Sequence, residues 1–204
     1  MDQAAYPGQV VSDAPVNVRA EFLTKTYSHL AGAAGAWVGL LAIMFQIPGN
    51  ERVLQLMTGR WSWLIVLGSY MVVSHLAHSW ASSATSKSVQ YAGLGIYVVA
   101  NSIITFPLVY IAANYAGPNV LPFAAAITLG LFFGLTLIVF VTRNDFSFMR
   151  GALMIGGLGA MAVIIGSIIF GFHLGVFFSV FMIVLFCGFI LYDTSNVLLH
   201  YEDD

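Results

Sequence analysis

Long apolar runs alternate with short polar connections along most of this chain. Six of the runs are long enough to cross a bilayer, since a transmembrane helix needs about 20 predominantly apolar residues. They cover approximately residues 29–47, 62–82, 89–113, 121–142, 151–171 and 174–199. The connections between them hold only about 2 to 14 residues, which leaves no room for a soluble catalytic domain. The pattern predicts an all-α polytopic membrane helical bundle over residues 29–204, with six transmembrane helices.

The first 28 residues differ from the rest of the chain because they are polar and mixed in charge. They lack the apolar core and the compact cleavage site of a secretory signal peptide. We expect residues 1–28 to form a cytoplasmic tail that ends in an interfacial turn near residues 16–27.

Composition agrees with a membrane protein and argues against several other classes. Hydrophobic residues make up 59% of the chain and charged residues 8%, compared with about 25% charged residues in soluble domains. The net charge is −2 and no basic cluster occurs, so nothing favours a nucleic-acid partner. The single cysteine, Cys187, lies in an apolar run and is expected to be a small buried hydrophobe. No nucleophile with a base, metal-ligand motif or phosphate loop is present, so we do not expect an enzyme.

The positive charges in the connections predict the orientation in the membrane. If the N-terminus is inside, five basic residues lie inside and two, Arg52 and Arg60, lie outside. The five inside residues would be Arg19, Lys25, Lys87, Arg143 and Arg150. This bias favours an N-terminus inside, and six crossings return the C-terminus to the same side.

Asp193 is the only acidic residue inside any of the six apolar runs. An ionisable group at membrane depth costs roughly 2.5 to 3.5 kcal/mol, so it usually faces a cavity or a partner. Since no basic residue lies within a run, three states are open: a neutral protonated acid, an acid facing water, or an acid whose partner is an ion or lies outside this chain. Asn196 and His200 follow on the same helical face. On the predicted topology Asp193 lies about 9 Å from the inner end of the helix.

The third run carries a polar stripe at Tyr97, Asn101 and Thr105, which share one helical face, followed by Pro107. Proline inside a helix removes a backbone hydrogen bond and bends the helix. These four residues either line a cavity or pore, or the stripe makes hydrogen bonds between helices beside a bend.

The second run carries His75 and His78 on one face. Two histidines at this spacing could line a cavity, carry protons or bind a metal. A transition metal would also need ligands from other helices, and the chain has no motif that supplies them. A buried polar face or an inner-surface boundary is the alternative.

The connection between the fourth and fifth runs carries Arg143 and Asp145. Asp145 is placed to cap the following helix, because its carboxylate can accept from free backbone amides there. A gating or docking role for this inner loop is the alternative.

In the first and fourth runs, small residues recur at four-residue spacing and predict close helix packing. These pairs are Gly32 with Ala36, Gly35 with Gly39, and Gly130 with Gly134.

Four stretches together resemble the Bax inhibitor (transmembrane BAX inhibitor motif) family, in particular its bacterial YccA-like branch. They are FLTKTY at residues 22–27, ITFP at 104–107, TRNDFSF at 142–148 and LYDTSN at 191–196. The similarity extends over roughly residues 20–200, and the motif around Asp193 is the most specific of the four.

The resemblance implies a seven-helix fold in which six helices surround a central seventh. It also implies a pH-sensitive calcium leak, in which an aspartate of the sixth helix pairs with an aspartate of the seventh. Asp193 matches the first aspartate and is the tentative Ca²⁺ ligand. The sequence ends at Asp204 before a counterpart of the second, which leaves open a truncated chain and a six-helix variant. Ca²⁺ is therefore the one ion that the resemblance suggests.

The same resemblance implies a rival function. Members of the YccA-like branch are associated with the membrane-anchored protease FtsH, in the bacterial cytoplasmic (inner) membrane. We therefore keep two expectations, a pH-sensitive calcium leak and a non-transporting partner that modulates or stabilises a larger membrane complex.

Overall fold

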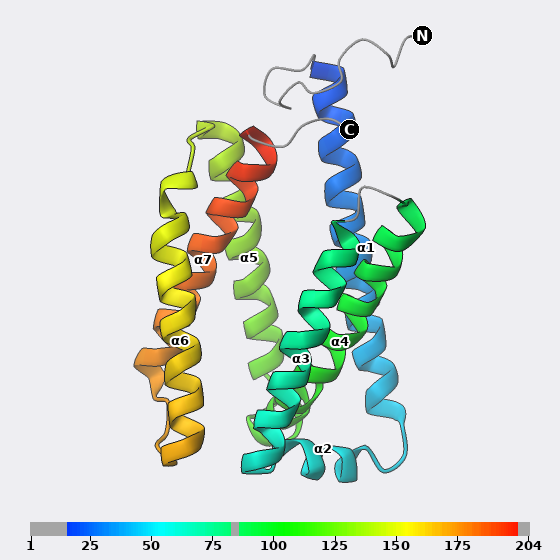
Figure 1. The fold of residues 1–204 in the computed structure, drawn as a ribbon, viewed down its shortest axis with the longest axis vertical. Helices are drawn as coiled ribbons and strands as arrows, with labels where there is room; N and C mark the ends of the chain where they lie inside the picture. Colours follow the sequence, from blue (N-terminus) through cyan, green and yellow to red (C-terminus); the bar gives the residue numbers. More distant parts are fainter. Residues whose placement is uncertain (1–15, 83–85, 200–204) are drawn as a thin grey trace. The chain divides into compact units, whose positions relative to one another are not determined.

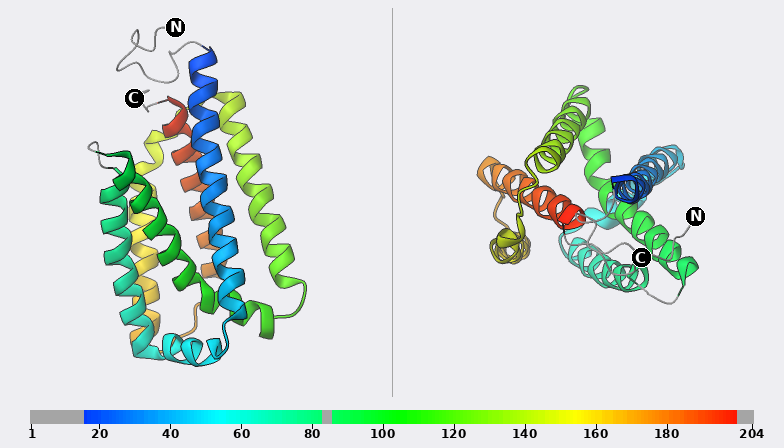
Figure 2. Two further views of the ribbon diagram at one scale, coloured as in Figure 1. Left: turned by 90° about the vertical axis from the view of Figure 1, so that its right-hand side faces the viewer. Right: turned by 90° about the horizontal axis from the view of Figure 1, so that it is seen from above.

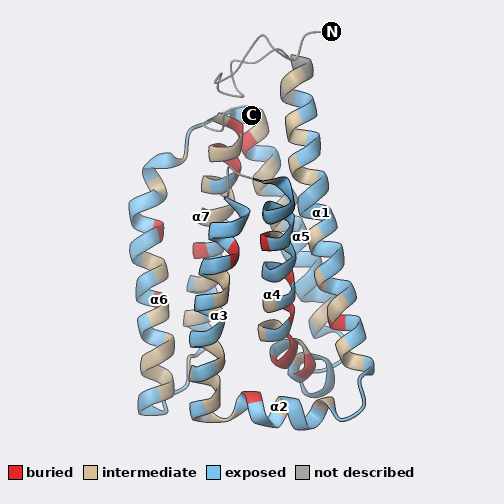
Figure 3. Cartoon of the chain, turned by 45° about the vertical axis from the view of Figure 1, so that its right-hand side comes forward, coloured by how far each residue is buried: buried red, intermediate tan, exposed pale blue. Residues whose placement is uncertain are grey.

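A computed structural model describes residues 16–82 and 86–199, apart from the side chains of residues 16, 17, 19 and 60. In this part of the chain every regular element is a helix, and no strand occurs. Six of the helices are long and apolar enough to cross a membrane. This confirms the expected polytopic helical bundle. Few residues of these six helices are buried (Figure 3), as expected for helices whose apolar surface faces lipid.

The helices follow one another through short connections (Figure 1). In chain order they are α1 (Val16–Gln46), α2 (Asn50–Thr58), α3 (Arg60–Ala81), α4 (Lys87–Tyr115), α5 (Val120–Thr142), the 3₁₀ turn η1 (Ser147–Met149), α6 (Arg150–Phe170) and α7 (Val176–Leu199). The chain forms two compact units. One unit holds residues 27–123, and the other holds the described residues before 27 and after 123.

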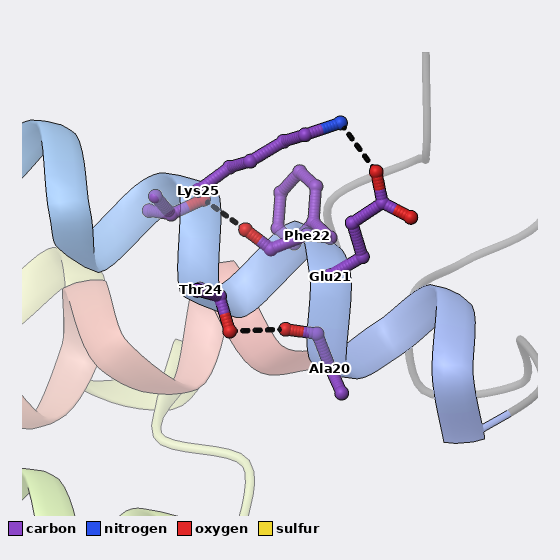
Figure 4. Close-up of polar contacts among 6 residues, drawn as sticks. Ala20, Glu21, Phe22, Thr24 and Lys25 are labelled. Carbon is purple, nitrogen blue, oxygen red and sulfur yellow. Dashed lines mark hydrogen bonds and ion pairs between the residues drawn. The ribbon is translucent and has the colours of Figure 1, made fainter.

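The polar beginning of α1 is helical. We expected an interfacial turn over residues 16–27, but α1 continues unbroken through this stretch. The hydroxyls of Thr24 and Thr26 each donate to the carbonyl four residues earlier, at 2.7 and 3.0 Å. Lys25 forms an ion pair with Glu21, also one turn away, at 2.7 Å (Figure 4). The polar side chains that suggested a turn therefore find partners within the helix itself.

In the unit of residues 27–123, α3 and α4 pack side by side (Figure 2). Gly93 of α4 lies directly against the backbone of α3. A Cβ added at Gly93 would lie 2.6 Å from the nitrogen of Ala81 and 2.7 Å from the carbonyl oxygen of Ala77. The close approach of these two helices therefore requires glycine at this position.

The second half of α1 contacts α4 through large apolar side chains. Leu41 of α1 is buried with Phe106 and Tyr110 of α4, and these three residues form the core of the unit. Phe45 lies one turn after Leu41. Its ring centroid is 5.5 Å from the ring centroids of both Phe106 and Tyr110. Aromatic contacts thus hold the C-terminal end of α1 against α4.

A short helix, α2, lies across the ends of α1 and α3 (Figure 1), where we expected only a connection. Met57 of α2 is buried, and Leu54 packs against the core that α1 and α4 share. The turn before α2 includes Gly49 with φ of +81°, a left-handed conformation that glycine adopts without strain.

In the other unit, α6 and α7 pack against each other. Leu153 and Ala160 of α6 are buried with Leu185 of α7. Gly188 of α7 faces Leu153, and a Cβ at Gly188 would lie 2.7 Å from the Leu153 Cδ2 atom. Gly156 of α6 is in similar contact with Leu185. Small residues therefore allow this pair of helices to approach closely.

The glycines for which we predicted close helix packing have open space beside them in the structure. A Cβ at Gly32, Gly35, Gly39, Gly130 or Gly134 would meet no atom within 4 Å beyond its neighbours and its own helix backbone. The four-residue spacing therefore identified faces that could approach another helix, but not faces that do so in the described part of this chain.

Candidate functional site

Asp193 lies on the exposed side of α7. The neighbouring Thr194, Ser195 and Leu198 are buried, and they share the opposite side of the helix. Asp193 itself is exposed. Asp193 therefore lies away from the side of α7 that these three residues bury.

The Asp193 carboxylate has no hydrogen bond and no ion pair with any described residue. Asn196, one turn further on, is partly buried, while His200 lies outside the described residues. No group of three or more His, Cys, Asp or Glu side chains that could hold a metal ion occurs in the described ranges. The carboxylate can therefore take up a proton, bind water or a cation, or accept from a group of another chain.

Ser195, two residues after Asp193, ties α7 to the loop between α5 and α6. Its hydroxyl is fully buried, accepts from the backbone N–H of Phe146 at 3.3 Å and donates to the carbonyl of Tyr192 at 2.9 Å. Our sequence reasoning passed over Ser195. The sequence did contain a signal for this contact, namely a serine in an apolar run. Buried hydroxyls are nearly always hydrogen-bonded, so such a serine predicts a partner.

The loop between α5 and α6 begins with backbone strain. Arg143 has φ of +51°, a conformation that residues other than glycine rarely adopt, and its N–H donates to the carbonyl of Val139 at 2.8 Å. Asp145 then accepts from the backbone N–H of Ser147 at 2.8 Å, at the start of η1. The carboxylate thus forms an Asx turn just before the 3₁₀ turn, whose N-cap is Phe146. Among the described residues no side chain caps α6 itself, whose N-cap is Met149.

The polar stripe of α4 makes hydrogen bonds between helices. The indole N–H of Trp37 in α1 donates to the Thr105 hydroxyl at 3.0 Å, and that hydroxyl donates to the carbonyl of Asn101 at 2.6 Å. The hydroxyl of Tyr70 in α3 donates to the side-chain oxygen of Asn101 at 3.3 Å. One face of α4 therefore connects to both neighbouring helices in its unit, as one of our two interpretations expected.

Two residues of the stripe also line a hollow. Tyr97 and Asn101 border a cavity of about 350 Å³ between α1 and α4, together with Trp37. Thr105 is not among the residues that line this cavity, and Pro107 is fully buried inside a continuous α4. The larger cavity between α3 and α4, of about 790 Å³, is lined almost entirely by apolar side chains.

The two histidines of α3 lie apart from these features. His75 and His78 are both exposed, and neither lines the cavities between α1, α3 and α4. With no third ligand near them in the described residues, the geometry brings no metal site together there.

Comparison with known proteins places these features in a family. A family model described as inhibitor of apoptosis-promoting Bax1 matches residues 19–204. The protein named Bax inhibitor 1 of Schizosaccharomyces pombe is 32% identical over 98 residues. The aligned part is 46% of this chain and 36% of that relative, so the chain covers about a third of the relative's length. No solved structure gives a significant match.

Proposed function

Because the chain belongs to the Bax inhibitor family, we propose that this integral membrane protein is a passive, pH-sensitive cation leak with Ca²⁺ as its cargo. The observation that supports the proposal most is the placement of Asp193. This acid stands alone in an apolar helix, is exposed, and has no partner among the described residues. An ionisable residue kept at membrane depth at such a cost is a functional group by default.

In the proposed mechanism, Asp193 binds either a proton or a cation. When protonated, the carboxyl is neutral and loses its attraction for Ca²⁺, so flux falls at low pH. When ionised, it offers hard oxygen ligands, which Ca²⁺ prefers. Asn196 and backbone carbonyls of α7 would add oxygens near it. Ca²⁺ takes about six to eight oxygens, so water or groups beyond the described residues would complete the shell.

Flux into liposomes tests the proposal. Purified full-length protein is reconstituted in vesicles that contain a calcium indicator, and the rate of influx is measured from about pH 5 to about pH 8. We expect influx to rise with pH, and we expect the variant Asp193→Asn to abolish this response because the amide binds no proton. An unchanged pH response in Asp193→Asn would remove the proposal.

A matched control replaces another acid by its amide. Glu21→Gln removes an exposed carboxylate whose ion pair with Lys25 joins two exposed side chains, where such pairs contribute little. We expect this variant to retain both the flux and its pH response. Loss of the response in both variants would show that general charge, not Asp193, controls the leak.

The proposal includes a location and an orientation. We place the protein in a bacterial cytoplasmic membrane with both termini inside, since the basic residues of the connections favour that side. We also propose that it has no enzymatic activity.

A second candidate is a non-transporting partner of a larger membrane complex, such as an FtsH-type protease. The open glycine faces of α1 and α5 support it, because they would accept the close approach of a helix from another protein. The variant Gly130→Leu would block such an approach on α5. This candidate predicts co-purification with one stoichiometric membrane complex, loss of that complex in Gly130→Leu, and no ion flux in liposomes.

A further inference from the structure

The helix α2 has an apolar side and a polar side. Successive residues of a helix are rotated by about 100°, so residues 53, 54, 56 and 57 fall within one half of the helix surface. Two of these, Leu54 and Met57, pack against the unit of residues 27–123. The other two, Val53 and Leu56, are 46% and 72% exposed. The apolar side of α2 is therefore wider than the protein surface that it covers.

The polar residues of α2 occupy the other half of the helix. Glu51, Arg52 and Gln55 are all exposed. Glu51 also accepts a hydrogen bond from the Tyr110 hydroxyl of α4 at 3.4 Å. In water, the exposure of Val53 and Leu56 would be unfavourable, because apolar surface is more stable when it is removed from water.

The position of α2 shows what covers these two side chains. α2 lies across the ends of α1 and α3, at the level where these membrane-spanning helices end (Figure 1). Exposed apolar residues continue from α2 onto both spans, with Ile43 of α1 58% and Ile65 of α3 71% exposed. Trp61, in the first turn of α3, is 64% exposed, and tryptophan is enriched at membrane interfaces. Exposed apolar side chains are thus present on α2 and on both spans that it joins.

We propose that α2 is an interfacial anchor that lies in the plane of one membrane leaflet. Val53 and Leu56 enter the boundary between phospholipid headgroups and acyl chains, and Glu51, Arg52 and Gln55 face the headgroups and water. Arg52 extends its guanidinium toward the lipid phosphates, as cationic side chains on such helices do. The anchor fixes the depth at which α1 ends and α3 begins.

Site-specific fluorescence tests the proposal on the full chain in phosphatidylcholine vesicles. Cys187 is the only cysteine, so a Cys187→Ser background accepts single cysteines for an environment-sensitive nitrobenzoxadiazole label. The adjacent positions Leu56→Cys and Gln55→Cys form a matched pair on the two sides of α2. We expect the label at position 56 to emit at shorter wavelength, and acyl-brominated lipid to quench it at least about twofold more than the label at position 55. Aqueous iodide should quench the label at position 55 preferentially.

Two results would overturn the proposal. Equal iodide quenching at both positions would show that Leu56 faces water. Protection of position 56 from both iodide and brominated lipid would show that protein covers it. Circular dichroism and size-exclusion elution of each labelled variant verify that it is folded. Since no ion flux enters the measurement, its outcome is independent of the proposed leak.

Discussion

At the scale of single residues, Gly93 is a position where the fold leaves no room for a side chain. We predict that Gly93→Ala destabilises the protein by about 1 to 3 kcal/mol, because the added methyl group must displace the backbone of α3. Gly95→Ala is the control on the same helix, since a Cβ there meets nothing within 4 Å. Thermal unfolding in detergent should show a lower Tm for Gly93→Ala and an equal or higher Tm for Gly95→Ala. Equal melting of both variants would mean that α3 and α4 are not in backbone contact.

Arg143 is a position where a change to glycine should stabilise the protein. Its left-handed backbone costs roughly 1 to 2 kcal/mol for a residue with a Cβ, so Arg143→Gly should raise the Tm. Arg150→Gly is the control that also removes one positive charge, and Arg150 has a helical backbone with φ of −48°. We expect it to lower the Tm, because glycine disfavours a helix. A lower Tm for Arg143→Gly would show that the side chain stabilises the loop more than its backbone strains it.

At the scale of elements, one hydrogen bond joins α7 to the loop between α5 and α6. Ser195→Ala leaves the N–H of Phe146 without its acceptor, at a cost of about 1 to 3 kcal/mol if the amide stays buried. We expect the loop to open more often and trypsin to cleave it faster after Arg143. Ser167→Ala is the control, because the Ser167 hydroxyl bonds only within α6 in the described residues. Equal cleavage of both variants would show that the bond does not restrain the loop.

The helices differ in how well the sequence predicts them. The six long spans follow from length and hydropathy, and the structure confirms them. The nine residues of α2 are too few and too polar to register as a span, and only the structure shows that they lie across the ends of α1 and α3. The start of α1 was misjudged because Thr24 and Thr26 satisfy their hydroxyls within the helix, which composition does not reveal.

The candidate site was predictable in its residues but not in its contacts. Asp193 follows from the cost of an acid in an apolar run. Its exposure depends on which side of α7 is buried, and that depends on side-chain contacts such as the one between Gly188 and Leu153. The bond between Ser195 and Phe146 joins residues 49 positions apart. Neither periodicity nor spacing carries such tertiary information, so these features needed coordinates.

At the scale of the whole molecule, the two sides of the membrane are assigned by charge alone. With both termini inside, the connection that holds α2 faces out and the loop between α5 and α6 faces in. Two exposed residues, Gln55 and Ser147, report on these two connections. Their opposite placement follows from counting crossings along the chain, because three spans, α3, α4 and α5, separate them.

We therefore predict opposite labelling of two single-cysteine variants in intact cells. In the Cys187→Ser background, a membrane-impermeant maleimide should react with Gln55→Cys from outside. It should react with Ser147→Cys only after the membrane is permeabilised. Labelling after permeabilisation is the internal control, because it shows that both thiols are reactive. The reverse pattern would invert the orientation and place Asp193 near the outer surface, where protons from the external medium rather than the cytoplasm would control a leak through this helix.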